Sequence, residues 1–285
     1  MIKIIRITFL FLFSAHYCLS QISDGTVKSL VNSEEYLNST MSLGGIKTTF
    51  LKSAATDCIL LKPNPINAKK YYSKQENTID YLYWKPEFAM ISKSGDFGFT
   101  TGPYIFRSNN HREFVPYDYG RYISVWKTNT EKEWKIVLEG RFLHLQSDTI
   151  FPLIYQDPSD YQYPKKIGPQ KINWRKDIVF NTDLILGKSL KLLGNKDLNE
   201  FYDPKVRLYF PGKLPIIGKK EAIQFFNSQS FAINSNPTFA DRALSGDLAY
   251  TYGKANIAGK KYSYIRIWQI DQEMKWNIII DAYLP

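Results

Sequence analysis

The chain repeats one nine-residue phrase, and this repeat constrains its fold more than any other feature. Residues 94–102 read SGDFGFTTG and residues 245–253 read SGDLAYTYG, with five of the nine positions identical. The order continues downstream, where YISVW and WKIVLEG follow the first phrase and YIRIW and WNIIIDA follow the second. Trp126 to Trp134 spans eight residues, as does Trp268 to Trp276. Matching order and spacing indicate a duplication, and therefore two copies of one domain.

Each copy is expected to begin with helices and to continue with strands. The apolar residues of the first helix share one helical face: Val27, Leu30, Val31, Leu37 and Met41. The second copy begins with a Leu-rich helix around 179–193 that Gly194 ends. Runs such as YISVWK and WKIVLE are rich in β-branched and aromatic residues and predict strands. The fold class is therefore α+β, with helices packed on an antiparallel sheet in each of two domains.

The repeated SGD itself is typical of a turn that leads into a strand. Ser and Asp side chains bond to nearby backbone groups, and Gly supplies a positive φ. The repeat of the phrase is thus explained by structure, and it requires no catalytic role for Asp96 or Asp247.

The first twenty residues have the layout of a secretory signal peptide. Lys3 and Arg6 precede the short apolar run ITFLFLF, and Cys18 and Ser20 take the −3 and −1 positions if cleavage precedes Gln21. The run is too short for a membrane span, which needs about 18 or more apolar residues. A lipoprotein signal is disfavoured because the bulky Tyr17 stands where a small residue is preferred. We expect an exported protein, periplasmic or secreted, with no membrane span.

The charge of the chain is basic but dispersed. The formal net charge is +10, and cleavage would leave 35 basic and 27 acidic residues, a net charge of +8. The lysines occur as scattered pairs such as Lys69-Lys70 and Lys260-Lys261, without a dense basic run, so we expect no nucleic-acid partner. Cleavage would also leave Cys58 as the one cysteine, in the apolar run TDCILL, where it is expected to pack in a core.

These features divide the chain into four parts. We expect a signal peptide over 1–20, a first domain over 21–148, a linker over 149–176 and a second domain over 177–285. The linker is rich in proline and aromatic residues, so it is expected to pack against one or both domains rather than act as a free tether.

Both copies resemble a known family. GNKDLNEFYDPKVRLYFPGKLPIIGKKEAIQFF (194–226) resembles the opening of a nuclear transport factor 2-like domain of the SnoaL-like kind. SGDFGFTTGPYIF, followed by GRYISVWK and EKEWKIVLEG, resembles the ketosteroid isomerase-homologue branch of that family. The resemblance implies two cone-shaped domains, each a curved sheet wrapped around helices with a pocket at its open end. Members dimerise through the sheet face, which for tandem copies implies an internal pseudo-dimer.

The resemblance does not carry a mechanism with it, because members include isomerases, cyclases, dehydratases and binding modules without catalysis. The isomerases of the branch place a carboxylate base just before the proline that ends the first strand, and here Lys62 and Phe210 stand in those positions. The second copy has no His and no Cys, which excludes Ser–His and Cys–His catalysis and a His/Cys zinc site there. We expect no metal and no cofactor.

The first copy is the better candidate for a functional site. Its residues 103–121 form a longer, polar loop that contains His111 and Arg121. His111 and Glu139, an acid near the end of an apolar strand, are candidate catalytic bases. Asp281 is the counterpart of Glu139 in the second copy. Arg121 and Asp281 are candidate ligand-binding residues, together with aromatic side chains expected in the pocket wall: Tyr36, Trp84, Tyr104, Tyr122 and Trp126.

Three functions remain open from the sequence. The first is binding of a small, partly apolar molecule in the cone pocket of the first domain. The second is an isomerase- or dehydratase-type enzyme that uses acid–base catalysis in that domain. The third is a non-catalytic module that docks a protein or an envelope component. Whether the protein is an enzyme is left undecided.

Overall fold

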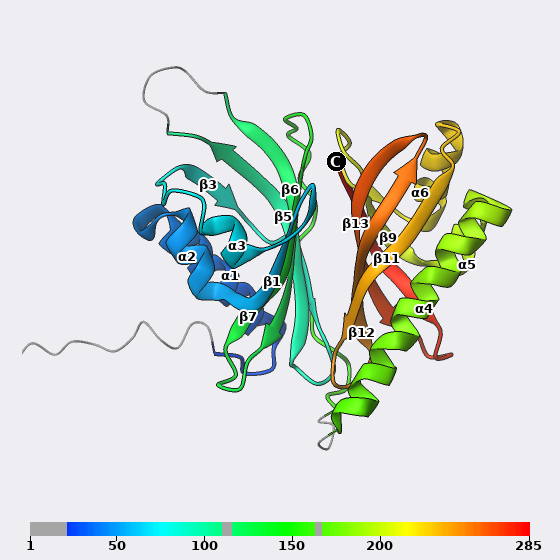
Figure 1. Ribbon diagram of the computed structural model, residues 1–285, viewed down its shortest axis with the longest axis horizontal. Coiled ribbons are helices and arrows are strands. Elements are labelled where there is room, and N and C mark those ends of the chain that lie inside the picture. Colours follow the sequence, from blue (N-terminus) through cyan, green and yellow to red (C-terminus); the bar gives the residue numbers. More distant parts are fainter. Residues whose placement is uncertain (1–21, 110–115, 163–166) are drawn as a thin grey trace, which may run out of the picture.

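Two β-sheets packed face to face form the centre of the molecule, and each sheet carries helices on its outer face (Figure 1). The computed structural model describes residues 22–109, 116–162 and 167–285. Its α+β architecture in two domains confirms the predicted fold class. Over these ranges no helix combines the length and the apolar character needed to cross a bilayer.

The first domain begins with helices and continues with strands, as predicted. Its elements are α1 (Val27–Gly44), α2 (Ile46–Ser53), β1 (Ala54–Lys62), β2 (Asn64–Asn67), α3 (Ala68–Tyr72), β3 (Tyr81–Trp84), β4 (Phe88–Ile91), β5 (Phe97–Arg107), β6 (Asp118–Thr128) and β7 (Trp134–Leu143). The strand order is β2-β1-β7-β6-β5-β4, with β3 also paired to β5. The sheet is antiparallel except that β1 runs parallel to β7 and that β4 runs parallel to a short strand of the linker.

The second domain repeats this topology. Its elements are α4 (Pro169–Leu193), α5 (Leu198–Phe201), β9 (Tyr202–Tyr209), β10 (Ile216–Ile217), α6 (Lys219–Ser228), β11 (Ile233–Arg242), β12 (Leu248–Ile257), β13 (Lys260–Ile270) and β14 (Trp276–Leu284). Their order is β10-β9-β14-β13-β12-β11, with β9 parallel to β14. Each strand therefore has its counterpart in the first sheet, which confirms the duplication inferred from the repeated phrase.

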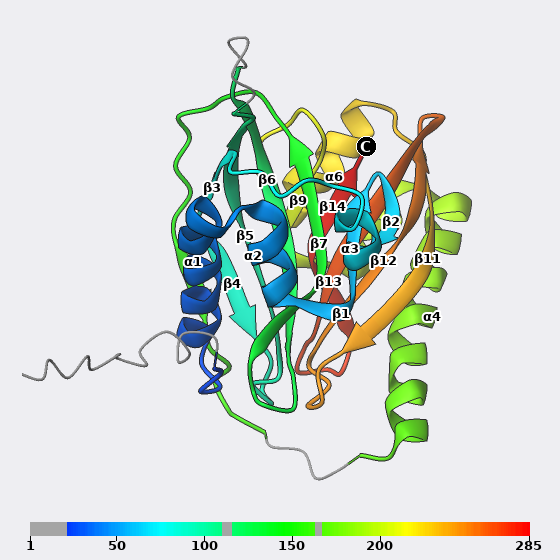
Figure 2. The same ribbon diagram turned by 60° about the vertical axis from the view of Figure 1, so that its left-hand side comes forward.

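The long helices follow the predicted apolar pattern. The five apolar residues assigned to the first helix are all buried on α1. Helix α4 ends before Gly194 (φ +77°), as expected for a glycine that terminates a helix. It begins at Pro169, earlier than the Leu-rich segment suggested, because proline is favoured at the first helical position. Figure 2 shows α1 and α2 in front of the first sheet and α4 beside β11.

The linker packs on the first domain. Its strand β8 (Ile154–Gln156) pairs in parallel with β4, and the Tyr155 hydroxyl donates to the Pro86 carbonyl at 2.8 Å. Lys93 forms an ion pair with Asp160 at 2.8 Å. The segment therefore extends the first sheet by one strand.

A shared apolar core lies between the two sheets. It combines residues from both domains, among them Phe97, Phe99 and Leu138 from the first and Tyr250, Ile267 and Leu284 from the second. The rings of Phe97 and Tyr250 stack at 5.9 Å. Each domain also has a core of its own beneath its helices. The contact between the sheets is thus continuous packing of apolar side chains, of the kind found in β-sandwiches.

The two SGD turns meet at one end of this interface. The hydroxyls of Ser94 and Ser245 lie 2.7 Å apart, and each accepts a hydrogen bond from the other's backbone amide, at 3.1 and 3.0 Å. Asp247 accepts from the Lys93 amide at 3.1 Å, and Asp96 accepts from the Leu244 amide at 3.3 Å. These reciprocal contacts are those of a two-fold interface formed within one chain. The turn of the first domain thus contacts the equivalent turn of the second domain.

Candidate functional site

A small polar cavity lies inside the first domain, between α1 and the helix-covered face of the sheet. Its volume is about 10 Å³, close to the space that one water molecule needs. Its walls come from one helix and four strands: Glu34, Leu37, Trp84, Tyr104, Tyr122, Ser124, Glu139 and Arg141. We call this space the inner cavity.

Glu34 projects into the inner cavity from the buried face of α1. Its side chain falls in the apolar stripe of the helix, and the residue is only 1% exposed. Trp84 Nε1 donates to Glu34 Oε1 at 2.9 Å, and the side chains of Thr100 and Tyr122 also lie within hydrogen-bonding reach of the carboxyl group. Burial raises the pKa of Glu34 to about 8. The carboxyl group is therefore mostly protonated at neutral pH.

Tyr122 lies beside Glu34 on β6. Its ring meets Trp84 edge to face at 6.4 Å, and its buried hydroxyl lies within hydrogen-bonding reach of the Glu34 carboxyl group. Burial and the neighbouring Glu34 raise the pKa of Tyr122, so the hydroxyl keeps its proton. The wall of the inner cavity thus contains two neighbouring buried groups that can each donate and accept a hydrogen bond.

Glu139 and Arg141 close the outer side of the inner cavity. They stand two residues apart on β7, and therefore on the same face of the strand, and form an ion pair at 2.5 Å. Together with Tyr104 they also line a second pocket of about 340 Å³, to which Phe106, Leu143 and the C-terminal Pro285 contribute. We call this the mouth pocket. A third pocket of about 510 Å³ adjoins it at Lys62, Phe106 and Arg141. The Glu139–Arg141 pair therefore separates the mouth pocket on one side from the inner cavity and Glu34 on the other.

The structure brings together four of the predicted site residues. Trp84, Tyr104, Tyr122 and Glu139 all line the inner cavity. Trp126 is buried nearby, where its Nε1 donates to Thr100 at 3.0 Å, and it lines neither the inner cavity nor the mouth pocket.

The other predicted residues lie elsewhere. Tyr36 is half-buried on α1 and lines neither space. Arg121 lies on the opposite face of the sheet, where it pairs with Glu87 and its guanidinium lies 5.7 Å from the ring centroid of Tyr209 in the second domain. Asp281 is buried inside the second domain. His111 lies outside the described residues.

Sequence reasoning missed Glu34, Ser124 and Arg141. A signal for Glu34 was present, since it falls four residues after Leu30 and three before Leu37 on the buried face of an amphipathic helix. A signal for Ser124 lay in the repeat, where YISVW and YIRIW differ most in character at Ser124 and Arg266. Arg141 gave no signal of its own.

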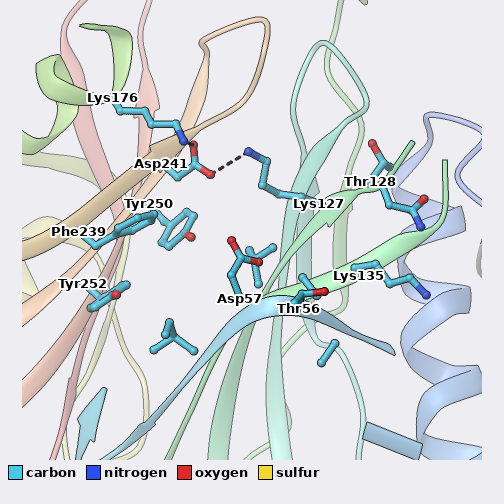
Figure 3. Close-up of a pocket in the computed structure, with 15 residues that line it drawn as sticks. Thr56, Asp57, Lys127, Thr128, Lys135, Lys176, Phe239, Asp241, Tyr250 and Tyr252 are labelled. Atoms are coloured by element: carbon cyan, nitrogen blue, oxygen red, sulfur yellow. Dashed lines mark hydrogen bonds and ion pairs between the residues drawn. The ribbon is translucent and has the colours of Figure 1, made fainter. Parts of the chain in front are cut away.

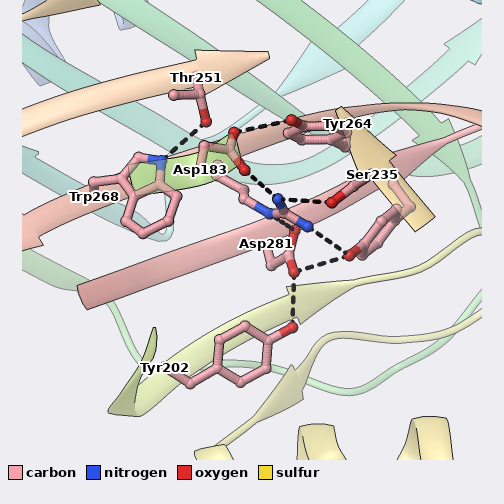
Figure 4. Close-up of polar contacts among 9 residues, drawn as sticks. Asp183, Tyr202, Ser235, Thr251, Tyr264, Trp268 and Asp281 are labelled. Atoms are coloured by element: carbon pink, nitrogen blue, oxygen red, sulfur yellow. Dashed lines mark hydrogen bonds and ion pairs between the residues drawn. The ribbon is translucent and has the colours of Figure 1, made fainter. Parts of the chain in front are cut away.

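In the second domain the equivalent space is filled by a charged network (Figure 4). Arg266 is fully buried, forms an ion pair with Asp183 on α4, and contacts Asp281 on β14 at 3.2 Å. Tyr264 donates to Asp183 at 2.9 Å and Tyr202 donates to Asp281 at 2.7 Å. Burial raises the pKa of Asp281, and the charge of Arg266 opposes that rise. The side chains of this network thus pair with one another.

A further pocket, of about 650 Å³, lies between the domains (Figure 3). Asp241 of β11 bridges two lysines there, Lys127 of the first domain at 2.8 Å and Lys176 of α4 at 3.1 Å. The pair with Lys127 joins the two domains, and the pair with Lys176 ties α4 to β11 within the second domain. In the described part of the chain, no three His, Cys, Asp or Glu side chains are grouped in a way that could hold a metal ion.

Comparison with solved structures gives the same families that the sequence resembles. The solved structures to which the chain is similar include nuclear transport factor 2-like and ketosteroid isomerase-like proteins. A nuclear transport factor 2-like protein from Cytophaga hutchinsonii is 14% identical, and the match covers 38% of this chain and 95% of that one, with a TM-score of 0.33. A ketosteroid isomerase, described as putative, from Parabacteroides distasonis is 14% identical over 43% and 94%, with a TM-score of 0.34.

A nuclear transport factor 2-like superfamily protein from Salmonella enterica is 10% identical over 42% of this chain and 92% of that one, with a TM-score of 0.36. Each match spans only about two fifths of this chain, and such low scores support no assignment of activity. No family model matches the sequence, and no curated protein matches it.

Proposed function

We propose that the first domain binds a small, partly apolar molecule whose polar head enters the inner cavity and whose body lies in the mouth pocket. The observation that carries this proposal is the buried, protonated Glu34 with the Tyr122 hydroxyl beside it, at a small cavity that shares Tyr104, Glu139 and Arg141 with the mouth pocket. Buried polar groups are almost always hydrogen-bonded, and the cavity leaves room beside these two groups for a water molecule or the polar head of a ligand.

The mouth pocket has the character of a small-molecule site. Its volume of about 340 Å³ is at the lower end of the range for ligand pockets. Its lining combines apolar side chains such as Leu60, Phe106 and Leu143 with the Glu139–Arg141 pair. The second domain, whose equivalent space is filled by its own side chains, then acts as a structural partner. On the strength of the N-terminal sequence alone, we place this activity outside the cytoplasm.

Native mass spectrometry of the mature protein, purified from the cell that exports it, tests the proposal. A discrete small adduct that is lost on denaturation is expected. Replacing Tyr122 by Phe should lower its occupancy at least tenfold, because the hydroxyl in the cavity is removed. Tyr36→Phe, on α1 and outside the cavity, is the matched control and should keep the adduct. A clean apo mass after incubation in cell extract would contradict the proposal and favour a module that docks a protein or an envelope component.

A second candidate function is acid–base catalysis, and one observation favours it. Glu34 has a pKa of about 8, so it can donate a proton at neutral pH and accept one again during turnover. Glu34→Gln keeps the shape of the side chain and separates the two functions. An enzyme would lose turnover of the bound molecule, whereas a binding protein would release the same molecule unchanged.

A further inference from the structure

The second domain has a buried cation, Arg266, at the position that corresponds to the inner cavity of the first domain. Strand register aligns Ser124 with Glu139 in the first domain and Arg266 with Asp281 in the second. Tyr122 and Tyr264 stand two residues earlier, and Trp126 and Trp268 two residues later, each tryptophan donating to a threonine at 3.0 and 2.9 Å. Ser124 therefore occupies the position of Arg266.

The acids around this position also correspond. Asp183 lies on the buried face of α4 and Glu34 on the buried face of α1, each with a leucine three residues later. Each of the two acids lies close enough to the equivalent tyrosine to affect its pKa. In the second domain a guanidinium lies between the helix acid and the strand acid. In the first domain the inner cavity lies between Glu34 and Glu139, with Ser124 in its wall.

We propose that the molecule bound by the first domain is a primary amine, whose ammonium head occupies the inner cavity beside Glu34 as the guanidinium of Arg266 does beside Asp183. This inference rests on the proposed function, since it names the chemistry of the ligand at the same site. The geometry that supports it is the equivalence of the two sites together with the cavity that Ser124 leaves open.

The charges of the site fit this head group. Arg141 already pairs with Glu139, and within the described ranges no lysine or arginine forms an ion pair with the buried Glu34. An ammonium beside Glu34 would favour the ionised carboxylate and lower its pKa. The site would then hold two carboxylates, Arg141 and the ligand cation, with a net charge of zero. A carboxylate ligand would instead meet Glu34 and Glu139.

The size of the site narrows the ligand class further. A cavity of about 10 Å³ holds a group the size of one water molecule, which suits an ammonium and not a guanidinium. The rest of the ligand would pass Tyr104 into the mouth pocket, along Phe106 and Leu143. The Glu139–Arg141 pair at this boundary would have to shift as the ligand enters, because both side chains line both spaces. The ligand class is therefore an alkyl or aryl primary amine.

Isothermal titration calorimetry of the mature chain with three size-matched probes tests this inference: 2-phenylethylamine, 2-phenylethanol and 3-phenylpropionate. The amine is expected to bind at least tenfold more tightly than the alcohol or the carboxylate. Because Glu34 is mostly protonated before binding, about one proton should be released at neutral pH, measured as the dependence of the heat on the buffer. Glu34→Gln should weaken amine binding at least tenfold and abolish proton release.

A second variant tests the equivalence of the two domains. Ser124→Arg places a guanidinium where the second domain has one and should abolish amine binding, while the exposed Ser147→Arg should leave binding unchanged. If Ser124→Arg fails to fold, the loss of amine binding and of proton release in Glu34→Gln still tests the inference. Binding of the alcohol or the carboxylate at least as tightly as the amine would overturn the inference and leave the proposed function standing. Binding of none of the probes, with a clean apo mass, would overturn both.

Discussion

At the residue scale, the two domains differ in whether a buried carboxyl group has a positively charged partner. Asp183 and Asp281 are ionisable groups with no solvent exposure, and Arg266 between them supplies an opposite charge at hydrogen-bonding distance. Glu34 has a comparable degree of burial and no cation beside it, and its pKa rises to about 8. The first arrangement is a network in which the charges of Asp183, Arg266 and Asp281 compensate one another, whereas the second leaves Glu34 protonated beside a small cavity.

The completeness of the second network makes Arg266 critical for stability. Arg266→Met removes the cation and leaves two buried carboxyl groups without a positive partner. Breaking a buried ion pair from one side typically costs about 3–5 kcal/mol, and we expect a loss of this size in the free energy of unfolding. Urea denaturation followed by tryptophan fluorescence measures it.

The triple variant Arg266→Met, Asp183→Asn and Asp281→Asn serves as its control. It removes the two acids together with the arginine, and it should regain a large part of the lost stability because no unpaired charge remains. A triple variant as unstable as Arg266→Met alone would show that the loss arises from packing and not from the buried charges.

The raised pKa of Glu34 predicts a pH-dependent stability. Between the ordinary value of 4.5 and the folded value of about 8, the folded chain holds a proton that the unfolded chain has released. Stability therefore falls as pH rises through this window, by at most about 1.4 kcal/mol per pH unit, and the loss ends above it. Urea denaturation of the wild type and Glu34→Gln at about pH 5.5, 6.5 and 7.5 measures the effect. The free energy of unfolding of the wild type should fall over this range, whereas that of Glu34→Gln should not show this fall, because glutamine does not titrate. Parallel pH profiles would contradict the prediction.

At the element scale, the SGD turns perform the same task twice. Gly95 (φ +66°) and Gly246 (φ +84°) adopt the left-handed conformation that glycine favours, which allows the chain to turn sharply before β5 and β12. The adjacent serines then face each other across the interface. A local turn sequence thus positions a contact between segments far apart in the chain.

Replacing these serines should show their coupling. Ser94→Ala and Ser245→Ala each remove the shared contact between the two hydroxyls, one of the amide bonds and the bond from the serine to the aspartate of its own turn, so each should cost at least about 0.5–1.5 kcal/mol. The double variant should cost less than the sum of the two, because the shared contact is lost only once. Chemical denaturation of the four proteins measures the cycle. Ser147→Ala, whose hydroxyl bonds only to nearby Thr149 in an exposed segment, is the control. Strict additivity would argue against the coupling.

Most elements could be predicted from local pattern, and most of the site could not. The apolar stripe of α1 and the β-branched runs of β6 and β7 are properties of consecutive residues, and they predicted helix and strands correctly. The inner cavity depends on which face of the sheet the helices cover, which alternation along a strand does not specify. Arg121 and Tyr122 are neighbours in sequence, yet one faces the second domain and the other the cavity.

At the scale of the whole molecule, the two domains of one chain pack sheet against sheet, in the way that two subunits of a dimer would. The faces that meet are the sheet faces without helices, and they bury large apolar side chains from both domains. At Gly140 of β7 the backbone of the first domain lies close to side chains of the second domain. A Cβ atom there would lie 2.6 Å from Leu284 Cδ2 and 2.9 Å from Ile265 Cδ1, both in the second domain. Glycine at this position lets the sheets approach each other.

A pair of substitutions at this contact tests whether the sheets pack as described. Gly140→Val adds atoms to a filled interface and should cost about 1–3 kcal/mol of stability. Leu284→Ala creates a cavity at the same place and should cost about 2–5 kcal/mol. In the double variant the valine can occupy the space left by the leucine, so the loss should be smaller than the sum of the two, by more than about 0.5 kcal/mol. Denaturation of the four proteins measures this coupling.

Gly168→Thr is the matched control, because no atom lies within 4 Å of the position its Cβ would take, and threonine has the shape of valine but is accepted as readily as glycine at the N-cap of α4. It should change the free energy of unfolding by less than about 0.5 kcal/mol, as for ordinary surface substitutions. If Gly140→Val were equally harmless, or if the two interface substitutions were additive, the β7 and β14 faces would not be in contact. The position of Pro285 of the second domain in the lining of the mouth pocket of the first would then have no support from this packing.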